Sequence, residues 1–192
     1  MAAPKVLVLV ADGSEEMEAV ITIDCLRRCQ VEVTVAGLLS TSPITCARLT
    51  TLLPDTSLPT IAASAPKSFD AIALPGGVGG ANAFAGSTDL HAVLRAFEKE
   101  GKIVAAICAA PIALKAAGVG VGKRITSHPS VRGVVVDDYK YSEERVVIDG
   151  KLITSRGPGT AFEFAFAIAK QLKGIDAVLE AVDPMLLPPG SY

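Results

Sequence analysis

The chain has 192 residues, half of them apolar, and its 18 basic and 20 acidic side chains give a formal net charge of −2. At roughly 150 residues per domain, this length predicts one globular domain, residues 1–192, whose core needs no disulfide bonds. A nucleic-acid-binding module would carry a basic face with interleaved aromatic side chains, whereas this chain has balanced charge and no Trp. We therefore expect no nucleic-acid partner.

Neither of two apolar segments has the features of a membrane or export signal. Residues 103–114 are too few to cross a bilayer and include Pro111. Residues 5–11 are followed by acidic side chains without the small-residue cleavage site of a signal peptide. The chain contains four cysteines: Cys25, Cys29, Cys46 and Cys108. Their spacing does not match a zinc site, so we expect a cytoplasmic protein with reduced thiols, no metal and no membrane association.

Strand and helix patterns alternate along the chain. The continuous apolar run at 6–11 is typical of a strand buried on both faces of a parallel sheet, and further strands are expected at 69–74 and 102–107. Other strands are expected at 30–37, in a β-ribbon within 40–66, at 124–126, after Val134, and in a hairpin of 145–148 with 152–154. Helices are expected at 14–29, 87–100, directly after Cys108, at 160–172 and at 175–181. This alternation predicts an α/β fold with a mostly parallel sheet and helices on both faces.

Two glycine-rich segments were tested as nucleotide-binding loops. Residues 76–80 (GGVGG) follow a strand but lack the G-x-G-x-x-G spacing after the first strand, which favours a backbone turn. Residues 118–123 (GVGVGK) resemble a phosphate-binding loop. However, Ala117 stands where that motif requires Gly, and Arg124 stands where it requires Ser or Thr. We therefore expect no nucleotide.

Cys108 is the residue whose position favours chemistry. It lies between the apolar strand 103–107 and an Ala-rich helical segment, and a sharp strand-to-helix turn exposes a nucleophile at the carboxyl edge of the sheet. The following helix N-terminus favours the thiolate. A lone cysteine among alanines is more often a core residue, but Glu18 and His128 are expected at the same edge and favour the functional interpretation.

The other cysteines and the second histidine are given no catalytic role. Cys25 and Cys29 lie one helical turn apart, and core packing is the stronger interpretation. Cys46 falls in a Thr-rich loop region, where it could be exposed or at an interface. His91 lies on a polar helix and is expected to be solvated.

Seven ordered motifs extend over nearly the whole chain. They are DGSEEME at 12–18, VTVAG at 33–37, LPGG at 74–77, AAICA at 105–109, SHP at 127–129, YSE at 141–143 and TSRGPGT at 154–160. With these motifs the chain resembles the ThiJ/PfpI superfamily, and most closely its DJ-1 branch of Parkinson disease protein deglycases. The resemblance implies a flavodoxin-like three-layer sandwich, a homodimer, and activity without a metal or organic cofactor.

The resemblance also assigns roles to particular residues. It implies that Cys108 is an easily oxidised nucleophile, that Glu18 is its hydrogen-bonding partner, and that His128 is the nearby imidazole. The remaining implied site residues are Gly77 and Ala109, whose backbone N–H groups form an oxyanion pocket, Arg48 and Arg156, which line the site, and Arg28 and Pro184, which border it near the dimer interface.

Three departures narrow the chemistry. Protease-like members carry His directly after the nucleophile, where this chain has Ala109. Class I glutamine amidotransferases carry Glu two residues after the catalytic His, where this chain has Ser130. Either triad therefore lacks a member. Ala110 stands where the DJ-1 motif has Gly, which adds one methyl group near the pocket.

These features lead us to expect a cofactor-independent glyoxalase or protein deglycase that acts on methylglyoxal, glyoxal or their early protein adducts. A Cys108 thiolate would add to the aldehyde, and Glu18 would move a proton between adjacent carbons as general acid and base. The competing interpretation is an oxidative-stress sensor and redox-regulated chaperone, in which oxidation of Cys108 to sulfinate is the signal. A third interpretation, a purely structural dimer, predicts an ordinary thiol pKa of ~8.5.

Overall fold

The structure is a computed structural model that describes residues 2–188 and 190–192. Its centre is a seven-stranded sheet in the order β10-β11-β7-β6-β1-β2-β5, in which β10 alone runs antiparallel to its neighbour. The strands of this sheet are β1 (Lys5–Val10), β2 (Glu32–Gly37), β5 (Thr56–Ser57), β6 (Ala71–Leu74), β7 (Ile103–Ile107), β10 (Val146–Asp149) and β11 (Leu152–Ser155). Two small ribbons pair β3 (Ile44–Thr45) with β4 (Thr51–Leu52) and β8 (Arg124–Ile125) with β9 (Lys140–Tyr141).

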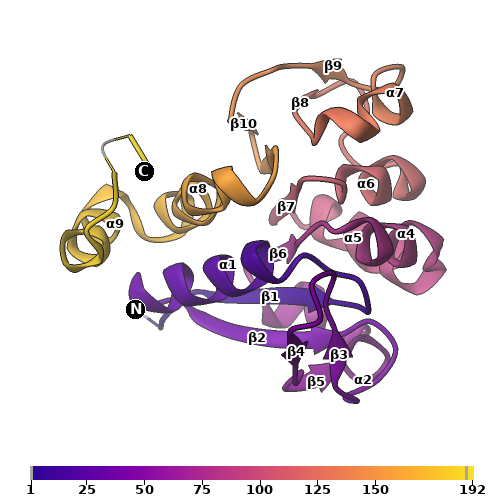
Figure 1. Ribbon diagram of the computed structural model, residues 1–192. Coiled ribbons are helices and arrows are strands. Elements are labelled where there is room, and N and C mark those ends of the chain that lie inside the picture. The colour runs from indigo at the N-terminus through magenta and orange to yellow at the C-terminus, as the bar shows by residue number, and fades with distance from the viewer. Residues whose placement is uncertain (1, 189) are drawn as a thin grey trace.

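Helices cover both faces of this sheet (Figure 1). One face carries α1 (Glu16–Arg28), α8 (Ala161–Lys173) and α9 (Ile175–Val182). The other carries α2 (Leu58–Ile61), α3 (Ala65–Ser68), α4 (Val78–Gly86), α5 (Thr88–Lys99), α6 (Pro111–Ala117) and α7 (Arg132–Val135). Within the described part of the chain, no helix combines the length and apolar character that spanning a membrane requires.

Strand β1 is an unbroken apolar run because both of its faces are buried. Val6 and Val8 pack under α1 and α8, whereas Leu7 and Leu9 pack under the helices of the opposite face, and all four are fully buried. Side chains of a strand point alternately to the two faces, so a strand covered on both sides has no polar positions. The expected α/β sandwich, with its mostly parallel sheet, is confirmed.

Two sequence expectations were wrong. The residues after Val134 do not begin a strand, because α7 continues to Val135 and β9 pairs only at residues 140–141. Val135 is buried while its neighbours Val134 and Val136 are 48% and 39% exposed, so this valine run has only one inward side chain. Helix α4 was not predicted, because its glycine-rich start reads as a turn.

The three other cysteines and His91, which were given no catalytic role, are all at least partly buried. Cys25 and Cys29 pack in the α1–α8 core, as expected. Cys46 is buried with Val10 and Ile44 in a small cluster under the β3–β4 ribbon. Of its two alternatives, exposure is therefore wrong, and a position at an interface stays a prediction. His91 is half-buried and its Nε2 atom has no hydrogen-bond partner among the described residues, which differs from a solvated imidazole.

The core between α8 and the sheet gives a test of the fold. Phe164 is fully buried there, so we expect Phe164→Ala to lower the free energy of unfolding by about 3–5 kcal/mol through lost burial and a cavity. Phe162, two residues earlier on α8, is only partly buried, and Phe162→Ala should cost clearly less. Urea titrations of both variants measure the difference. Equal losses would contradict this packing.

Candidate active site

Cys108 occupies the turn between β7 and α6 with a positive φ of 65°. A left-handed conformation costs a non-glycine residue roughly 1–2 kcal/mol, so neighbouring contacts must hold it. The Cys108 N–H donates to the Ser155 carbonyl at the end of β11 (2.9 Å), and the Cys108 carbonyl accepts from the His128 N–H (2.7 Å). These bonds leave the side chain half-exposed at the carboxyl edge of the sheet.

Glu18 reaches this turn from the first turn of α1 and is fully buried. Its Oε2 atom accepts a hydrogen bond from the Gly76 N–H at 2.7 Å, and its carboxyl group hydrogen-bonds to the Cys108 thiol. A Cβ atom on Gly76 would lie 2.6 Å from the Cys108 Cβ and 2.9 Å from Glu18 Oε2. Gly76 therefore permits the close approach of these two side chains. The sequence reading missed its role, although it is the first glycine of the LPGG motif.

Two backbone donors face the Cys108 sulfur. The N–H groups of Gly77 and Ala109 both hydrogen-bond to Cys108. Gly77 has a φ of 81°, and a Cβ atom there would overlap the Gly13 carbonyl oxygen and lie 2.6 Å from the Glu15 nitrogen. Only glycine fits at this position, which explains why the donor comes from a glycine.

Burial dominates the ionisation of this pair. It raises the pKa of Glu18 from its ordinary 4.5 to about 7, against the opposing effect of the hydrogen bonds from Gly76 and Cys108. Burial, and then the charge of Glu18, raise the pKa of Cys108 to about 12, while the N–H groups of Gly77 and Ala109 lower it. The higher thiol pKa belongs to the state with an ionised Glu18. The two groups therefore titrate as one unit, which gains its first negative charge with a pKa of about 7.

His128 lies beside the nucleophile, on the turn that leads to a short 3₁₀ segment, Pro129–Val131. Its backbone bonds to Cys108 as described, and its Nδ1 atom contacts Ser130. A Cβ atom on Gly157 would lie 3.6 Å from the His128 ring. His128 and Cys108 are thus joined through their backbones, in agreement with a shared edge.

Arg48 and Arg156 are held by acidic residues near this edge. The backbone N–H of Arg48 donates to Glu16 Oε1 at 2.8 Å, and this bond joins the β3–β4 ribbon to the first turn of α1. Arg156 donates from Nη1 to the carbonyl and the carboxylate of Glu143 at 2.6 and 2.7 Å. Glu143 also forms an ion pair with Arg132, so one carboxylate positions the guanidinium groups of Arg132 and Arg156. The sequence reading gave Glu143 no role, although it closes the YSE motif.

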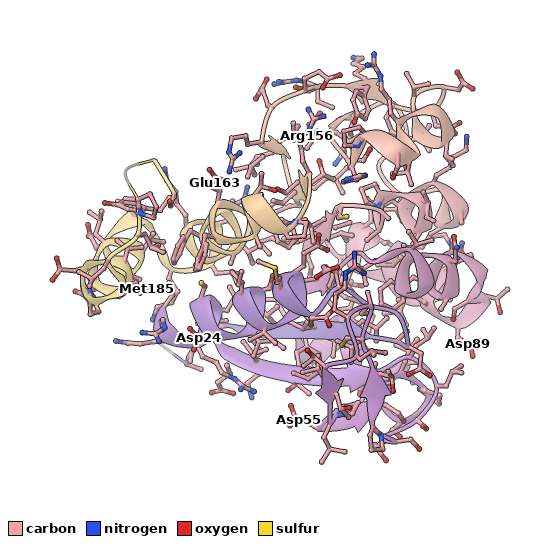
Figure 2. The ribbon with its side chains drawn as sticks, viewed as in Figure 1. Asp24, Asp55, Asp89, Arg156, Glu163 and Met185 are labelled. Carbon is pink, nitrogen blue, oxygen red and sulfur yellow. The ribbon has the colours of Figure 1, made fainter. Side chains whose placement is uncertain are left out.

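Arg28 and Pro184 are not brought to Cys108 within one chain. Arg28 pairs with Asp24 (2.6 Å) at the end of α1, ten residues and roughly 15 Å of helix beyond Glu18. Pro184 is exposed in the 3₁₀ segment Asp183–Met185. Figure 2 shows Asp24 and Met185 on the side of α9, away from Arg156. That these two residues border the site through a second copy of the chain stays a prediction.

Ala110 does not narrow the pocket. It has helical backbone angles (φ −59°, ψ −25°) and is fully buried in the core beneath α4, α5 and α6. Its methyl group therefore packs inward, away from the edge that carries Cys108.

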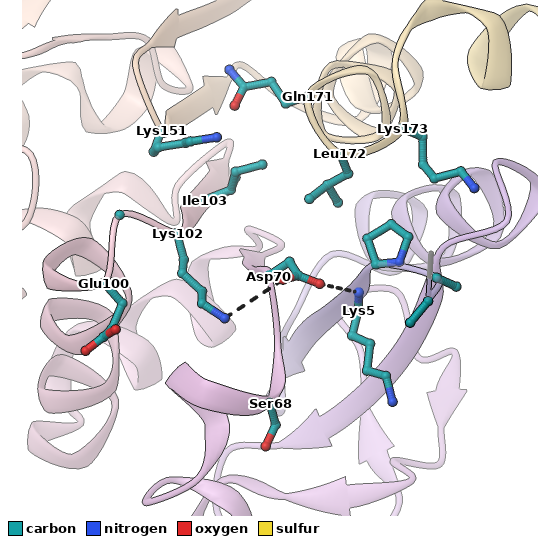
Figure 3. Close-up of a pocket in the computed structure, with 14 residues that line it drawn as sticks. Lys5, Ser68, Asp70, Glu100, Lys102, Ile103, Lys151, Gln171, Leu172 and Lys173 are labelled. Atoms are coloured by element: carbon teal, nitrogen blue, oxygen red, sulfur yellow. Dashed lines mark hydrogen bonds and ion pairs between the residues drawn. The ribbon is translucent and has the colours of Figure 1, made fainter.

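A cavity of about 790 Å³ opens at the opposite, amino edge of the sheet (Figure 3). Lysines and two acidic residues dominate its charged lining: Lys5, Lys102, Lys151, Lys173, Asp70 and Glu100. Asp70 accepts from the Lys5 N–H (2.9 Å), and the Lys102 ammonium group binds the Phe69 carbonyl (2.5 Å). In the described residues, no three His, Cys, Asp or Glu side chains come together to hold a metal ion. The nucleophile and its partners thus gather at the other edge.

Known proteins are similar to this chain over most of its length. A model of the DJ-1/PfpI family matches residues 4–171. The chain belongs to the DJ-1/PfpI family. Among DJ-1 relatives, Drosophila melanogaster protein dj-1beta is 47% identical over 94% of this chain and 96% of its own length. The Caenorhabditis elegans glutathione-independent glyoxalase DJR-1.2 is 37% identical over 97% of this chain and 99% of its own.

Solved structures of DJ-1 proteins have the same fold. The crystal structure of Drosophila melanogaster DJ-1beta superposes with a TM-score of 0.94 at 46% identity, covering 97% of this chain and all of that one. Oxidised Toxoplasma gondii DJ-1 superposes with a TM-score of 0.87 at 34% identity, covering 96% and 98%. The implied flavodoxin-like fold is thereby confirmed.

The raised pKa of Glu18 predicts how stability depends on pH. An unfolded Glu18 ionises near pH 4.5, whereas the folded Glu18–Cys108 pair gains its first negative charge near pH 7. The stability that the uncharged pair contributes is therefore full below pH 4.5 and falls until about pH 7. A shift of this size corresponds to about 3 kcal/mol. In urea titrations, the free energy of unfolding of the wild type should therefore fall by about 2–3 kcal/mol between pH 5 and pH 8. This fall should be absent in Glu18→Gln.

The exposed Glu100 provides a matched control. Glu100→Gln should retain the wild-type pH dependence. A Glu18→Gln variant whose stability falls with pH in parallel with the wild type would contradict the assignment of the raised pKa to Glu18.

Proposed function

We propose that this protein is a glutathione-independent glyoxalase and protein deglycase that acts on methylglyoxal, glyoxal and their early adducts. The observation that carries the proposal is the placement of the half-exposed Cys108 sulfur between the buried Glu18 carboxyl group and two backbone N–H donors. The glyoxalase name of the nematode relative agrees with it.

The number of hydrogen bonds favours a thiolate beside a protonated Glu18. Two N–H groups, from Gly77 and Ala109, face the sulfur, whereas Glu18 accepts from only one, that of Gly76. Glu18 Oε1 has no hydrogen-bond partner among the described residues, so the proton of a neutral Glu18 can lie on this oxygen. Hydrogen bonds to a charged group are stronger than those to a neutral one, so the charge is best placed on Cys108.

The proposed reaction begins with addition of the Cys108 thiolate to the aldehyde carbon of methylglyoxal. A C–S bond forms, the C=O π bond breaks, and the resulting alkoxide takes the Glu18 proton to give a hemithioacetal. The Glu18 carboxylate then removes the proton from this carbon and returns one to the neighbouring carbon through an enediol, which leaves a thioester. Water hydrolyses the thioester to lactate and restores the thiolate and the protonated Glu18. The sum is methylglyoxal plus water to lactate and one proton, which is released to solvent, without net oxidation.

Deglycase activity follows from the same chemistry. An early adduct of a dicarbonyl with a thiol or amine still carries an oxygen-bearing carbon next to a carbonyl group. Transfer of that carbon to Cys108 releases the protein group, and the proton transfer and hydrolysis then proceed as for the free aldehyde. The sulfur is half-exposed, so an adduct presented at the edge of the sheet can reach it.

A second candidate function, oxidation sensing, uses the same sulfur. A hydroperoxide would transfer oxygen to the thiolate, first to sulfenate and then to sulfinate. A protonated Glu18 and the N–H groups of Gly77 and Ala109 are suited to hydrogen-bond the sulfinate oxygens. The oxidised Toxoplasma gondii relative is consistent with this candidate. An oxidised sulfur cannot add to an aldehyde, so oxidation would end turnover.

Lactate formation from methylglyoxal by reduced protein without glutathione tests the proposal. We expect turnover by the wild type, none by Cys108→Ser, and a loss of about 10²-fold or more in kcat for Glu18→Gln, which cannot shuttle a proton. Cys29→Ala, a change in the core at the far end of α1, serves as the control and should keep wild-type turnover. Equal, negligible rates for wild type and Cys108→Ser would refute the enzyme and favour the sensor.

A further inference from the structure

Ser130 contacts the imidazole of His128 in two ways. The Ser130 backbone nitrogen lies 3.2 Å from His128 Nδ1, and the Ser130 hydroxyl oxygen lies 2.7 Å from the same ring nitrogen. The 3₁₀ turn that carries both residues is closed by the Val131 N–H, which donates to the His128 carbonyl at 3.1 Å. The ring is therefore oriented by its own turn and needs no other element of the fold.

The backbone contact determines where the imidazole carries its proton. A peptide N–H can only donate, so Nδ1 must offer its lone pair to Ser130 and cannot bear a hydrogen. The neutral ring then holds its single proton on Nε2. The Ser130 hydroxyl, which can donate or accept, is left to donate to the same lone pair. Both contacts thus favour one tautomer, Nε2–H.

We propose that Ser130 is a positioning residue, which holds His128 in the Nε2–H tautomer so that the ring donates a hydrogen bond to the carbonyl oxygen of the substrate. The identity of that acceptor rests on the proposed glyoxalase function, whereas the tautomer does not. A neutral imidazole can polarise a carbonyl group without losing its proton, as in triosephosphate isomerase. His128 would therefore stabilise the developing alkoxide while Glu18 supplies the proton.

The contacts of Cys108 agree with this division of roles. The thiol already has a proton partner in Glu18, so it does not require a second base. His128 is fixed beside the nucleophile because its backbone N–H donates to the Cys108 carbonyl at 2.7 Å. A carboxylate at position 130 would accept a hydrogen bond from a protonated Nδ1 and leave Nε2 as a base. The Ser130 hydroxyl acts in the opposite direction, because it can donate to an unprotonated Nδ1, whereas a carboxylate can only accept.

The tautomer can be read by NMR on the resting protein. The chain has two histidines, His91 and His128, so histidine ¹⁵N labelling with a His91→Gln variant assigns every ring nitrogen. Long-range ¹H–¹⁵N spectra of the neutral ring should show an unprotonated Nδ1 and a protonated Nε2 at His128. Ser130→Thr should preserve this pattern, and Ser130→Asp should move the proton to Nδ1. Ser64→Asp, whose parent hydroxyl binds the Ile61 carbonyl, is the matched control and should leave the pattern unchanged.

Kinetics provide the second readout. Ser130→Asp should lower kcat for methylglyoxal at least about tenfold while KM changes less, and Ser130→Thr should keep most of kcat. A wild-type spectrum with the proton on Nδ1, or an unchanged tautomer in Ser130→Asp, would overturn the inference. Because the tautomer is measured without substrate, a wild type that forms no lactate would refute the glyoxalase function and leave this test intact.

Discussion

The hydrogen bond between the Glu18 carboxyl group and the Cys108 thiol is the interaction on which the rest of the site depends. Burial of Glu18 and partial burial of Cys108 raise both pKa values, and the pair gains its first negative charge near pH 7. The left-handed turn at Cys108 and the missing side chain at Gly76 bring the two groups together. Donors from Gly77 and Ala109 then favour the charge on sulfur. The ionisation of the Glu18–Cys108 pair therefore depends on the turn, the glycine and the two donors together.

Much of this arrangement could be predicted from the sequence, because local patterns carry it. Strands covered on both faces read as unbroken apolar runs, and Cys108 stands at the junction of such a run with a helix. What could not be predicted depends on contacts between distant segments. The hydrogen bond from Gly76 to Glu18 joins residues 58 apart in the chain. Likewise, the burial of Cys46 beneath a β-ribbon depends on packing that its Thr-rich neighbours do not indicate.

The two candidate functions make different demands on one sulfur. Aldehyde addition requires a free thiolate that is regenerated in every cycle, whereas sensing requires that oxygen be retained on it. The same protonated Glu18 and backbone donors serve both, because a hemithioacetal oxygen and a sulfinate oxygen are both hydrogen-bond acceptors. His128, held by Ser130 as a donor, adds a group that matters to carbonyl chemistry. Membership of the DJ-1/PfpI family is consistent with both candidate functions. Both depend on whether Cys108 or Glu18 carries the negative charge in the resting protein.

That state can be measured directly from the ultraviolet absorbance of the thiolate during a pH titration. The spectrum of Cys108→Ser is subtracted from that of the wild type, since the other three cysteines are buried and common to both. The account predicts that one thiolate forms with a midpoint near pH 7, while Glu18 keeps its proton. A difference spectrum without thiolate until above about pH 10 would place the charge on Glu18 and contradict the account.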